Sequence, residues 1–406
     1  MARLQEGAQI QTASRNRDGF RERREDVTAV LLVANWDSGV GYAWWLMEEY
    51  WAQLSEHYER RERVWLAYPS ISTISEGIAA APVTPVIQSF GGRSLASLLE
   101  QCRFLRRRRV RLMYLSDWGT WDWRYVLFRF CGVRKIIVHD HTPGQRPRPR
   151  RLRRWLKRRV NRTPWLAADG SIGATDFVRE RLIQVNCFPR SRTYSVPNGL
   201  PARRTAAERA ATDPRQLFNI PASRLILVMT GRANRYKNVG FVIQCIAGLV
   251  ARGRRDMHFL FIGDGPDLQH FRDHAESHDA SEYCTFAGRR QDVAAILPGC
   301  DFAIHPSLGE VGYSLSILEY MQAGLPVIVP DNPSVCAATE HETTGLVYQE
   351  GDAAAAVAAI ERLLDDKALR ATMGEMAARA VTEKFCLERA RVALLNAFRE
   401  IDPLPT

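Results

Sequence analysis

The chain has 406 residues, of which 46% are hydrophobic, and this is enough apolar material for the cores of two domains of ordinary size. Its formal net charge of +11 favours an anionic partner, such as nucleic acid, anionic lipid or a phosphorylated substrate. The eight cysteines contain no C-x-x-C pair, which argues against a disulfide framework or a zinc ribbon. No apolar run reaches the roughly 18 residues of a transmembrane helix. We therefore expect a cytoplasmic protein with reduced thiols.

The N-terminal part alternates apolar runs with helical stretches, a pattern typical of βαβ units and parallel sheets. Residues 1–26 are polar and Arg-rich, so we expect a flexible arm and no signal peptide. Beyond the arm, residues 27–205 are predicted to form a Rossmann-like domain. Its expected elements are strands at Val27–Ala34, Val64–Ala67, Arg111–Leu115, Lys135–Val138 and Ala168–Ile172, and a helix at Thr175–Val185.

Two loops of this domain carry candidate site residues. The first strand leads to Gly39 and Gly41, which lack a side chain and would let the backbone approach a ligand, although a tight turn explains them equally well. The strand ending at Val138 leads to His139-Asp140-His141. We predict no metal site there, because neighbouring strand residues point to opposite faces and no further ligand motif accompanies them.

The segment 146–162 contains ten basic residues in seventeen and no acidic residue. Its apolar residues are spaced to form one face of a helix, and they are Leu152, Trp155, Leu156 and Val160. Such a helix either packs on its own domain or lies on an anionic membrane surface, and both interpretations stay open. No nucleic-acid-binding signature accompanies the arginines, so we expect no nucleic-acid partner.

Prolines and an Ala/Arg-rich stretch near 200–214 indicate a linker, and residues 215–386 are predicted to form a second Rossmann-like domain. Three of its apolar strands lead to polar loops. The strand from Leu225 is followed by Gly231-Arg232-x4-Lys237, the strand from His258 by Gly263-Asp-Gly265-Pro, and Phe302–Ile304 by a loop with Glu310 and a helix with Glu319. Open α/β sheets bind ligands at this edge, and a helix N-terminus there suits a diphosphate.

In order and spacing, these motifs resemble those of the retaining glycosyltransferases of family four, also called glycosyl transferases group one, which have the GT-B fold. The resemblance covers residues 196 to about 390. It implies two Rossmann-like domains facing across a cleft, with a C-terminal helix at about 387–406 that crosses back onto the first domain. It also implies that the second domain binds a nucleotide-diphosphate sugar and the first an acceptor. We expect no cofactor besides this donor.

The resemblance further implies a role for each matching residue. Arg232 and Lys237 would stabilise the diphosphate leaving group, since fixed cations stabilise charge that develops in a transition state. Glu310 and His139 would orient the donor sugar, and Glu319 would accept hydrogen bonds from the ribose hydroxyls. The other implied donor-binding residues are Gly312, Tyr313, Ser314, Gly263, Gly265, Gly39 and Gly41.

One departure from the family pattern concerns the two glutamates. The family has seven residues between them, whereas eight separate Glu310 from Glu319 here. We expect the loop to absorb the additional residue while Glu310 still points inward. The predicted function is sugar transfer, of a hexose by resemblance, to an acceptor that the sequence does not identify. A lipid-linked molecule and a cell-surface glycan precursor are two candidates, and peripheral attachment to the inner face of the membrane is left open. Two alternatives remain: another GT-B enzyme such as a nucleotide-sugar epimerase, and a non-enzymatic basic scaffold on a degenerate transferase fold.

Overall fold

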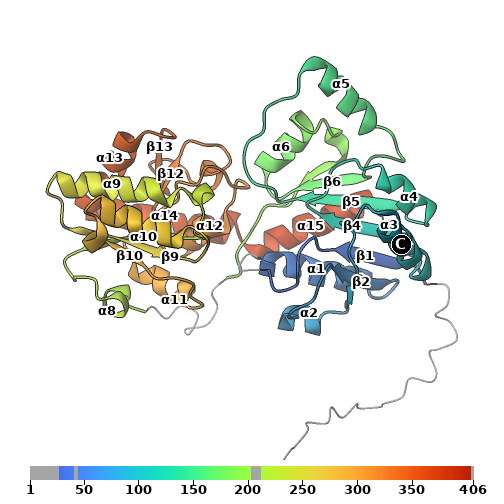
Figure 1. Ribbon diagram of the computed structural model, residues 1–406, viewed down its shortest axis with the longest axis horizontal. Helices are drawn as coiled ribbons and strands as arrows, with labels where there is room; N and C mark the ends of the chain where they lie inside the picture. The colour runs from blue at the N-terminus through green and yellow to red at the C-terminus, as the bar shows by residue number, and fades with distance from the viewer. Residues whose placement is uncertain (1–26, 41–43, 203–211, 404–406) are drawn as a thin grey trace, which may run out of the picture.

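The computed structural model describes residues 27–40, 44–202 and 212–403. These residues form two α/β lobes that lie side by side (Figure 1). Each lobe is built on one parallel sheet, and the fold class predicted from the sequence is therefore confirmed. The predicted flexible arm at 1–26, most of the predicted linker and Gly41 lie outside the described residues.

The N-terminal domain has a seven-stranded parallel sheet in the order β3-β2-β1-β4-β5-β6-β7. The strands are β1 (Ala29–Val33), β2 (Arg63–Tyr68), β3 (Thr84–Ile87), β4 (Val110–Ser116), β5 (Lys135–Asp140), β6 (Gly170–Gly173) and β7 (Thr193–Ser195). The helices are α1 (Trp44–Tyr58), α2 (Glu76–Ala80), α3 (Leu95–Arg107), α4 (Arg124–Phe130), α5 (Arg151–Val160) and α6 (Asp176–Gln184). Every residue of β1 is buried, as expected for a central parallel strand with both faces covered.

The two strands that the sequence did not predict, β3 and β7, are the edges of this sheet. Both are short, and β3 contains Pro85. Proline has no backbone N–H to donate to a neighbouring strand, so within sheets it occurs mainly in edge strands. Short edge strands lack the continuous apolar run that marks a buried strand, so their pattern resembles that of a loop.

The C-terminal domain has a six-stranded parallel sheet in the order β10-β9-β8-β11-β12-β13. The strands are β8 (Leu225–Thr230), β9 (Met257–Ile262), β10 (Cys284–Phe286), β11 (Phe302–Ile304), β12 (Val327–Pro330) and β13 (Gly345–Tyr348). The helices are α8 (Pro214–Phe218), α9 (Val239–Ala251), α10 (Leu268–Ser277), α11 (Val293–Ile296), α12 (Leu315–Gln322), α13 (Ala353–Asp365) and α14 (Lys367–Lys384). One apolar cluster fills each face of the sheet.

The last helix, α15 (Leu387–Ile401), returns to the N-terminal domain, as the red ribbon in Figure 1 shows. Its apolar face, including Leu394 and Phe398, is part of the core on one side of the N-terminal sheet. Just beyond the helix, Asp402 accepts hydrogen bonds from the Tyr58 hydroxyl at 3.0 Å and from Arg111 at 2.8 and 3.0 Å. The C-terminal segment therefore fastens the two domains together.

Candidate functional site

A cavity of about 480 Å³ lies between the two domains. Its lining residues follow the carboxyl ends of parallel strands in both sheets, where open α/β folds bind ligands. The N-terminal domain contributes Trp36, Val40, Trp44, Leu46, Met47, Ser116, Asp117, His141 and Asn198. The C-terminal domain contributes Arg232, Lys237, Glu310, Val311, Ser314, Leu315 and Ser316. The wall of the N-terminal domain is thus largely apolar, while the opposite wall is mainly charged and polar.

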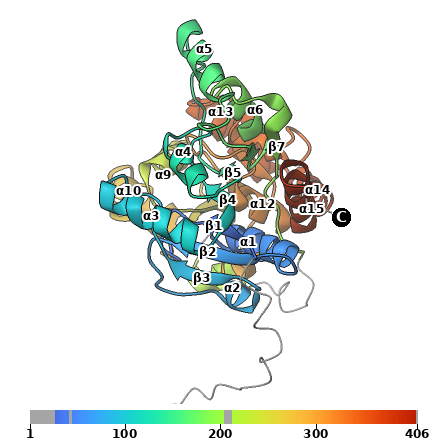
Figure 2. The same cartoon turned by 90° about the vertical axis from the view of Figure 1, so that its right-hand side faces the viewer.

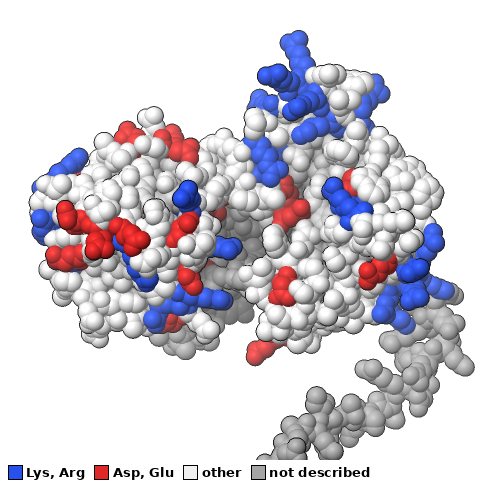
Figure 3. Space-filling view, viewed as in Figure 1, with Lys and Arg blue, Asp and Glu red and all other residues white. Residues whose placement is uncertain are grey.

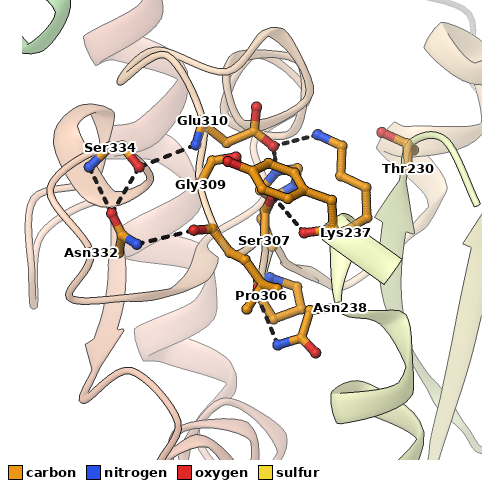
Figure 4. A network of polar contacts seen from close by, with 12 residues as sticks. Thr230, Lys237, Asn238, Pro306, Ser307, Gly309, Glu310, Asn332 and Ser334 are labelled. Atoms are coloured by element: carbon orange, nitrogen blue, oxygen red, sulfur yellow. Dashed lines mark hydrogen bonds and ion pairs between the residues drawn. The ribbon is translucent and has the colours of Figure 1, made fainter. Parts of the chain in front are cut away.

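Glu310 points into this cavity and forms an ion pair with the Lys237 ammonium (Figure 4). The same carboxylate oxygen accepts a hydrogen bond from His305 Nε2 at 2.9 Å. Burial by itself would raise the pKa of the Glu310 carboxyl, but Lys237 and His305 outweigh burial and hold this pKa well below its usual range. Glu310 is therefore a carboxylate at neutral pH.

The N-terminal domain holds the backbone of the Glu310 loop at three points. The amide of Gly144 donates to the carbonyl of Glu310 at 2.9 Å. The Thr175 hydroxyl donates to the next carbonyl, that of Val311, and Asn198 Nδ2 donates to the carbonyl of Tyr313 at 3.0 Å. Three separate elements of one domain thus position the central loop of the other.

Within the segment between the two glutamates, Gly312 lies directly against Thr175. Gly312 has a φ of 99°, and a Cβ at this position would lie 2.8 Å from the Thr175 hydroxyl oxygen. Only glycine combines this backbone angle with such a close approach. Glu310 and Val311, which precede Gly312 in this loop, both line the cavity.

Positive charge and helix amides meet on the C-terminal wall. Arg232 is exposed in the loop after β8, and Lys237 ends the short 3-10 helix Arg235–Lys237. The first residues of α12 line the same wall, and the Ser314 side chain does not cap the helix. A helix N-terminus with free amides attracts anions, so this wall can hold a diphosphate between two cations and a helix.

Several residues predicted to bind the donor do not line this cavity. Gly263 and Gly265 instead let the loops after β8 and β9 approach each other, since a Cβ at either position would overlap a backbone carbonyl of the Arg232 loop. Gly39 bonds to the Asp37 side chain through its amide at 2.8 Å, and the Tyr313 ring packs on Phe385. Glu319 lies on α12, beyond the residues that line the cavity.

The structure corrects the position expected for the cleft histidine. His139 is fully buried, with its ring stacked on Tyr50 and hydrogen-bonded to the Tyr114 hydroxyl at 2.5 Å. The residue that lines the cavity is His141, whose ring lies 3.9 Å from that of His139. His139 lies within β5 and is buried in the core, whereas His141 is the first residue after this strand and lines the cavity.

Asp117 is a cavity residue that the sequence analysis missed. It has a positive φ of 58°, unusual for a residue other than glycine, and its carboxylate accepts from the His141 amide at 2.7 Å. Burial raises the pKa of Asp117, although the neighbouring His141 opposes this shift. Ser116 and Asp117 directly follow a strand predicted to end at Leu115, and this placement is the signal that would have identified them.

No group of three or more His, Cys, Asp and Glu side chains arranged to hold a metal ion occurs in the part of the chain that the structure describes. Of the His139-Asp140-His141 trio, Asp140 is engaged elsewhere, because it is buried and paired with Arg181 at 3.2 Å.

The sheet order, the facing domains and the returning α15 are the architecture of the GT-B class. Residues 224–366 match the family model described as Glycosyl transferases group 1. A glycosyltransferase from Rickettsia africae has a TM-score of 0.75 at 14% identity, with 94% of this chain and all of that chain covered. HepE from Anabaena, solved in complex with UDP, has a TM-score of 0.69 at 15% identity and covers 92% of this chain and 100% of its own.

Two curated relatives match part of the chain. N-acetyl-alpha-D-glucosaminyl L-malate synthase of Bacillus anthracis is 28% identical over 45% of this chain and 47% of its own length. Alpha-D-kanosaminyltransferase of Streptomyces kanamyceticus is 27% identical over 68% of this chain and 73% of its own. The match thus spans about half of the first relative and nearly three quarters of the second. The family match lies in the C-terminal domain, which contributes the cationic wall of the cavity with Arg232 and Lys237.

Proposed function

We propose that this protein transfers a sugar from a nucleoside-diphosphate sugar to an acceptor hydroxyl in the cavity between its domains. One observation carries this proposal: on the cavity wall formed by the C-terminal domain, Arg232, Lys237 and the N-terminus of α12 lie beside the Glu310 carboxylate. A bound diphosphate would face two cations and a helix N-terminus, and the sugar attached to it would lie next to Glu310.

In the proposed reaction, the bond between the anomeric carbon and the diphosphate oxygen breaks, and a bond from that carbon to the acceptor oxygen forms. The acceptor proton passes to the departing diphosphate. Arg232 and Lys237 stabilise the charge that grows on this leaving group, the largest electrostatic change of the step. Attack from the face that the diphosphate leaves would retain the anomeric configuration. The donor is a substrate, and the proposal requires no separate cofactor.

The named activities of relatives support this class of reaction. HepE was solved with UDP-glucose as well as UDP, which motivates a uridine-linked hexose as the first donor to test. A relative from Escherichia coli, 25% identical over 43% of this chain, is named as a galactosyltransferase that acts on alpha-D-GlcNAc-diphosphoundecaprenol. On this support we include hexosyl transfer and a lipid-linked acceptor in the proposal. Glu319 on α12 is the proposed partner of the ribose hydroxyls.

A thermal-shift panel of nucleoside diphosphates and their sugars tests donor binding, because a ligand that binds only the folded state raises the unfolding temperature. We expect one nucleoside-diphosphate sugar to stabilise the wild-type protein. Arg232→Ala should weaken this binding and lower turnover by about 10²–10³-fold. Arg235→Ala is the matched control, since Arg235 is an exposed arginine of the same loop that does not line the cavity.

The same panel, together with an assay of sugar transfer, separates the alternatives. Equal losses in Arg232→Ala and Arg235→Ala would contradict the assignment of the cationic wall. An epimerase would convert the bound donor without transferring the sugar to any acceptor. A scaffold that has lost the chemistry would show no stabilisation by any nucleoside-diphosphate sugar.

A further inference from the structure

Helix α5 is unlike the other long helices of the described chain, because none of its ten residues is buried. It projects from the N-terminal domain beyond α6 in both views (Figures 1 and 2). Three of its four apolar residues are among the most exposed in the structure: Leu152 is 70% exposed, Trp155 54% and Leu156 47%, while Val160 is half-buried. The interpretation that this helix buries its apolar face in its own domain is therefore excluded.

Two polar contacts attach α5 and the residue after it to the domain. Lys157 Nζ donates to the carbonyl of Val185 at 2.9 Å. Asn161, directly after the helix, donates to the carbonyl of Asn186 at 2.8 Å. Successive helical residues are about 100° apart, so Lys157 and Asn161 lie on the side roughly opposite Leu152. The helix thus presents a polar side to the protein and an apolar side to solvent, the reverse of a helix in a globular domain.

The exposed apolar side is surrounded by positive charge. The segment 146–162 has ten basic residues and no acidic residue, and Figure 3 shows Lys and Arg side chains gathered over this projection. The Arg159 guanidinium lies 5.4 Å from the centre of the Trp155 ring. A few residues further on, Trp165 is 50% exposed and packs on Phe130, which is 67% exposed. Exposed aromatic and aliphatic groups therefore continue beyond the helix.

We propose that α5 docks on the surface of an anionic lipid bilayer, with Leu152, Trp155 and Leu156 among the headgroups and the arginines on the lipid phosphates. Two features of the helix favour this partner over a nucleic acid. Phosphate contacts alone would account for the arginines but would leave the two leucines in water. A bilayer interface takes up both, because it offers negative charge at the surface and an apolar layer directly beneath.

The docking surface is connected to the cavity by a short segment. Residues 141–150 run from His141 at the cavity wall to the start of α5, and on the way Gly144 bonds to the carbonyl of Glu310. Along the chain, only residues 142–150 therefore separate the cavity residue His141 from the helix that would bind the bilayer. The docking itself requires neither donor nor transfer, so it can fail or succeed independently of the proposed function.

Co-sedimentation of the full chain with vesicles tests the docking. The expected result is binding to phosphatidylcholine vesicles that contain phosphatidylglycerol, little binding to phosphatidylcholine alone, and release when salt is raised from about 0.05 to 0.5 M. Arg153→Gln with Arg158→Gln should lower the partition coefficient about 30-fold, since each basic residue near such a surface contributes about a fivefold factor. Leu152→Gln with Trp155→Gln should lower it about tenfold or more without changing the charge.

Helix α3 supplies matched controls for both variants. Arg103→Gln with Arg107→Gln removes the same charge from exposed positions, and Leu95→Gln with Leu99→Gln removes two leucines that are 74% and 48% exposed. The leucine control should change the partition coefficient by no more than about twofold. The arginine control should lower it only slightly more, because it reduces the net charge of the protein and so its long-range attraction to the vesicles. All four positions changed on α5 are exposed, so the variants should unfold at the wild-type temperature.

Three outcomes would overturn the proposal. The first is the absence of binding to the anionic vesicles. The second is an equal loss in the α3 and α5 arginine variants, which would mean that net charge alone attracts the protein. The third is tighter binding to single-stranded RNA that is insensitive to Leu152→Gln with Trp155→Gln, which would identify a nucleic-acid surface.

Discussion

Lys237 and Glu310 join the loops that follow β8 and β11, and their ion pair sits on the cavity wall where a diphosphate would lie. The carboxylate has a second partner in His305, at 2.9 Å, and the His305 side chain is fully buried. Burial lowers the pKa of His305 despite the nearby carboxylate, so its ring is neutral and donates through Nε2. The buried Glu310 carboxylate therefore holds the Lys237 ammonium at the cavity wall, where it can also bind an anionic ligand.

The first prediction concerns the stability of this pair. The folded pKa of Glu310 lies below the ordinary 4.5, so its stabilisation is complete above that pH and is lost as the pH falls further. Glu310→Gln should cost about 1–3 kcal/mol of unfolding free energy at neutral pH. Unfolding temperatures measured between pH 7 and about 3.5 should therefore converge for the wild type and the variant on acidification. Two curves that stay parallel across this range would contradict the assignment.

The second prediction separates the two histidines. His141→Ala should lower kcat/KM about 10–100-fold, the scale of a lost hydrogen bond to a charged or developing group, with little change in unfolding temperature. His139→Ala should instead cost about 2–4 kcal/mol of stability, because it leaves a cavity beneath Tyr50 and leaves the Tyr114 hydroxyl without its partner. Transfer assays and thermal unfolding of both variants would check this. The reverse pattern would restore His139 as the residue that meets the donor.

The third prediction concerns the hold of the N-terminal domain on the Glu310 loop. Thr175→Val keeps the shape of the side chain but removes the hydroxyl that donates to the Val311 carbonyl. A displaced loop should lower kcat/KM about 10–100-fold, as small errors of position do in active sites. The same hydroxyl caps α6 by accepting from the Val178 amide at 3.2 Å, so a stability loss of about 1 kcal/mol should accompany the change.

Thr175→Ser is the control for this experiment, because serine keeps the hydroxyl and loses only the methyl group. It should retain most of the activity and the cap. If the valine variant lost stability but kept full kcat/KM in assays of the folded fraction, the hydrogen bond to the loop would have no role in positioning Glu310.

The fourth prediction concerns the glycines next to the Arg232 loop. Gly263→Ala should destabilise the protein by about 1–3 kcal/mol or more, since its Cβ would overlap the carbonyl oxygen of Gly231. Gly248→Ala is the control: it lies in α9 with no atom within 4 Å of the added Cβ, and it should be neutral or stabilise by about 0.5–1 kcal/mol. Denaturant unfolding measures both. Equal changes in unfolding free energy for the two variants would mean that the loops after β8 and β9 can move apart at little energetic cost.

Much of this molecule follows from patterns that are local in the chain. Runs such as Ala29–Val33 and the stretch 259–262 are apolar because both faces of a parallel strand are covered, and this makes them visible in the sequence. Arg232 is the second residue after such a strand, β8. Because the carboxyl ends of parallel strands meet at one edge, a position just after a strand already implies a position near the cavity.

Other features depended on contacts between distant parts of the chain. Asn198 and Thr175 meet the Glu310 loop only because two domains face each other, and nothing near them in the sequence encodes that partner. The choice between His139 and His141 depended on where β5 ends, because His139 lies within the strand and His141 directly after it. For α5, the sequence determined an amphipathic basic helix, since its period is local. Whether the apolar side met a core or solvent was decided by the tertiary structure, because this depends on what the rest of the fold places beside it.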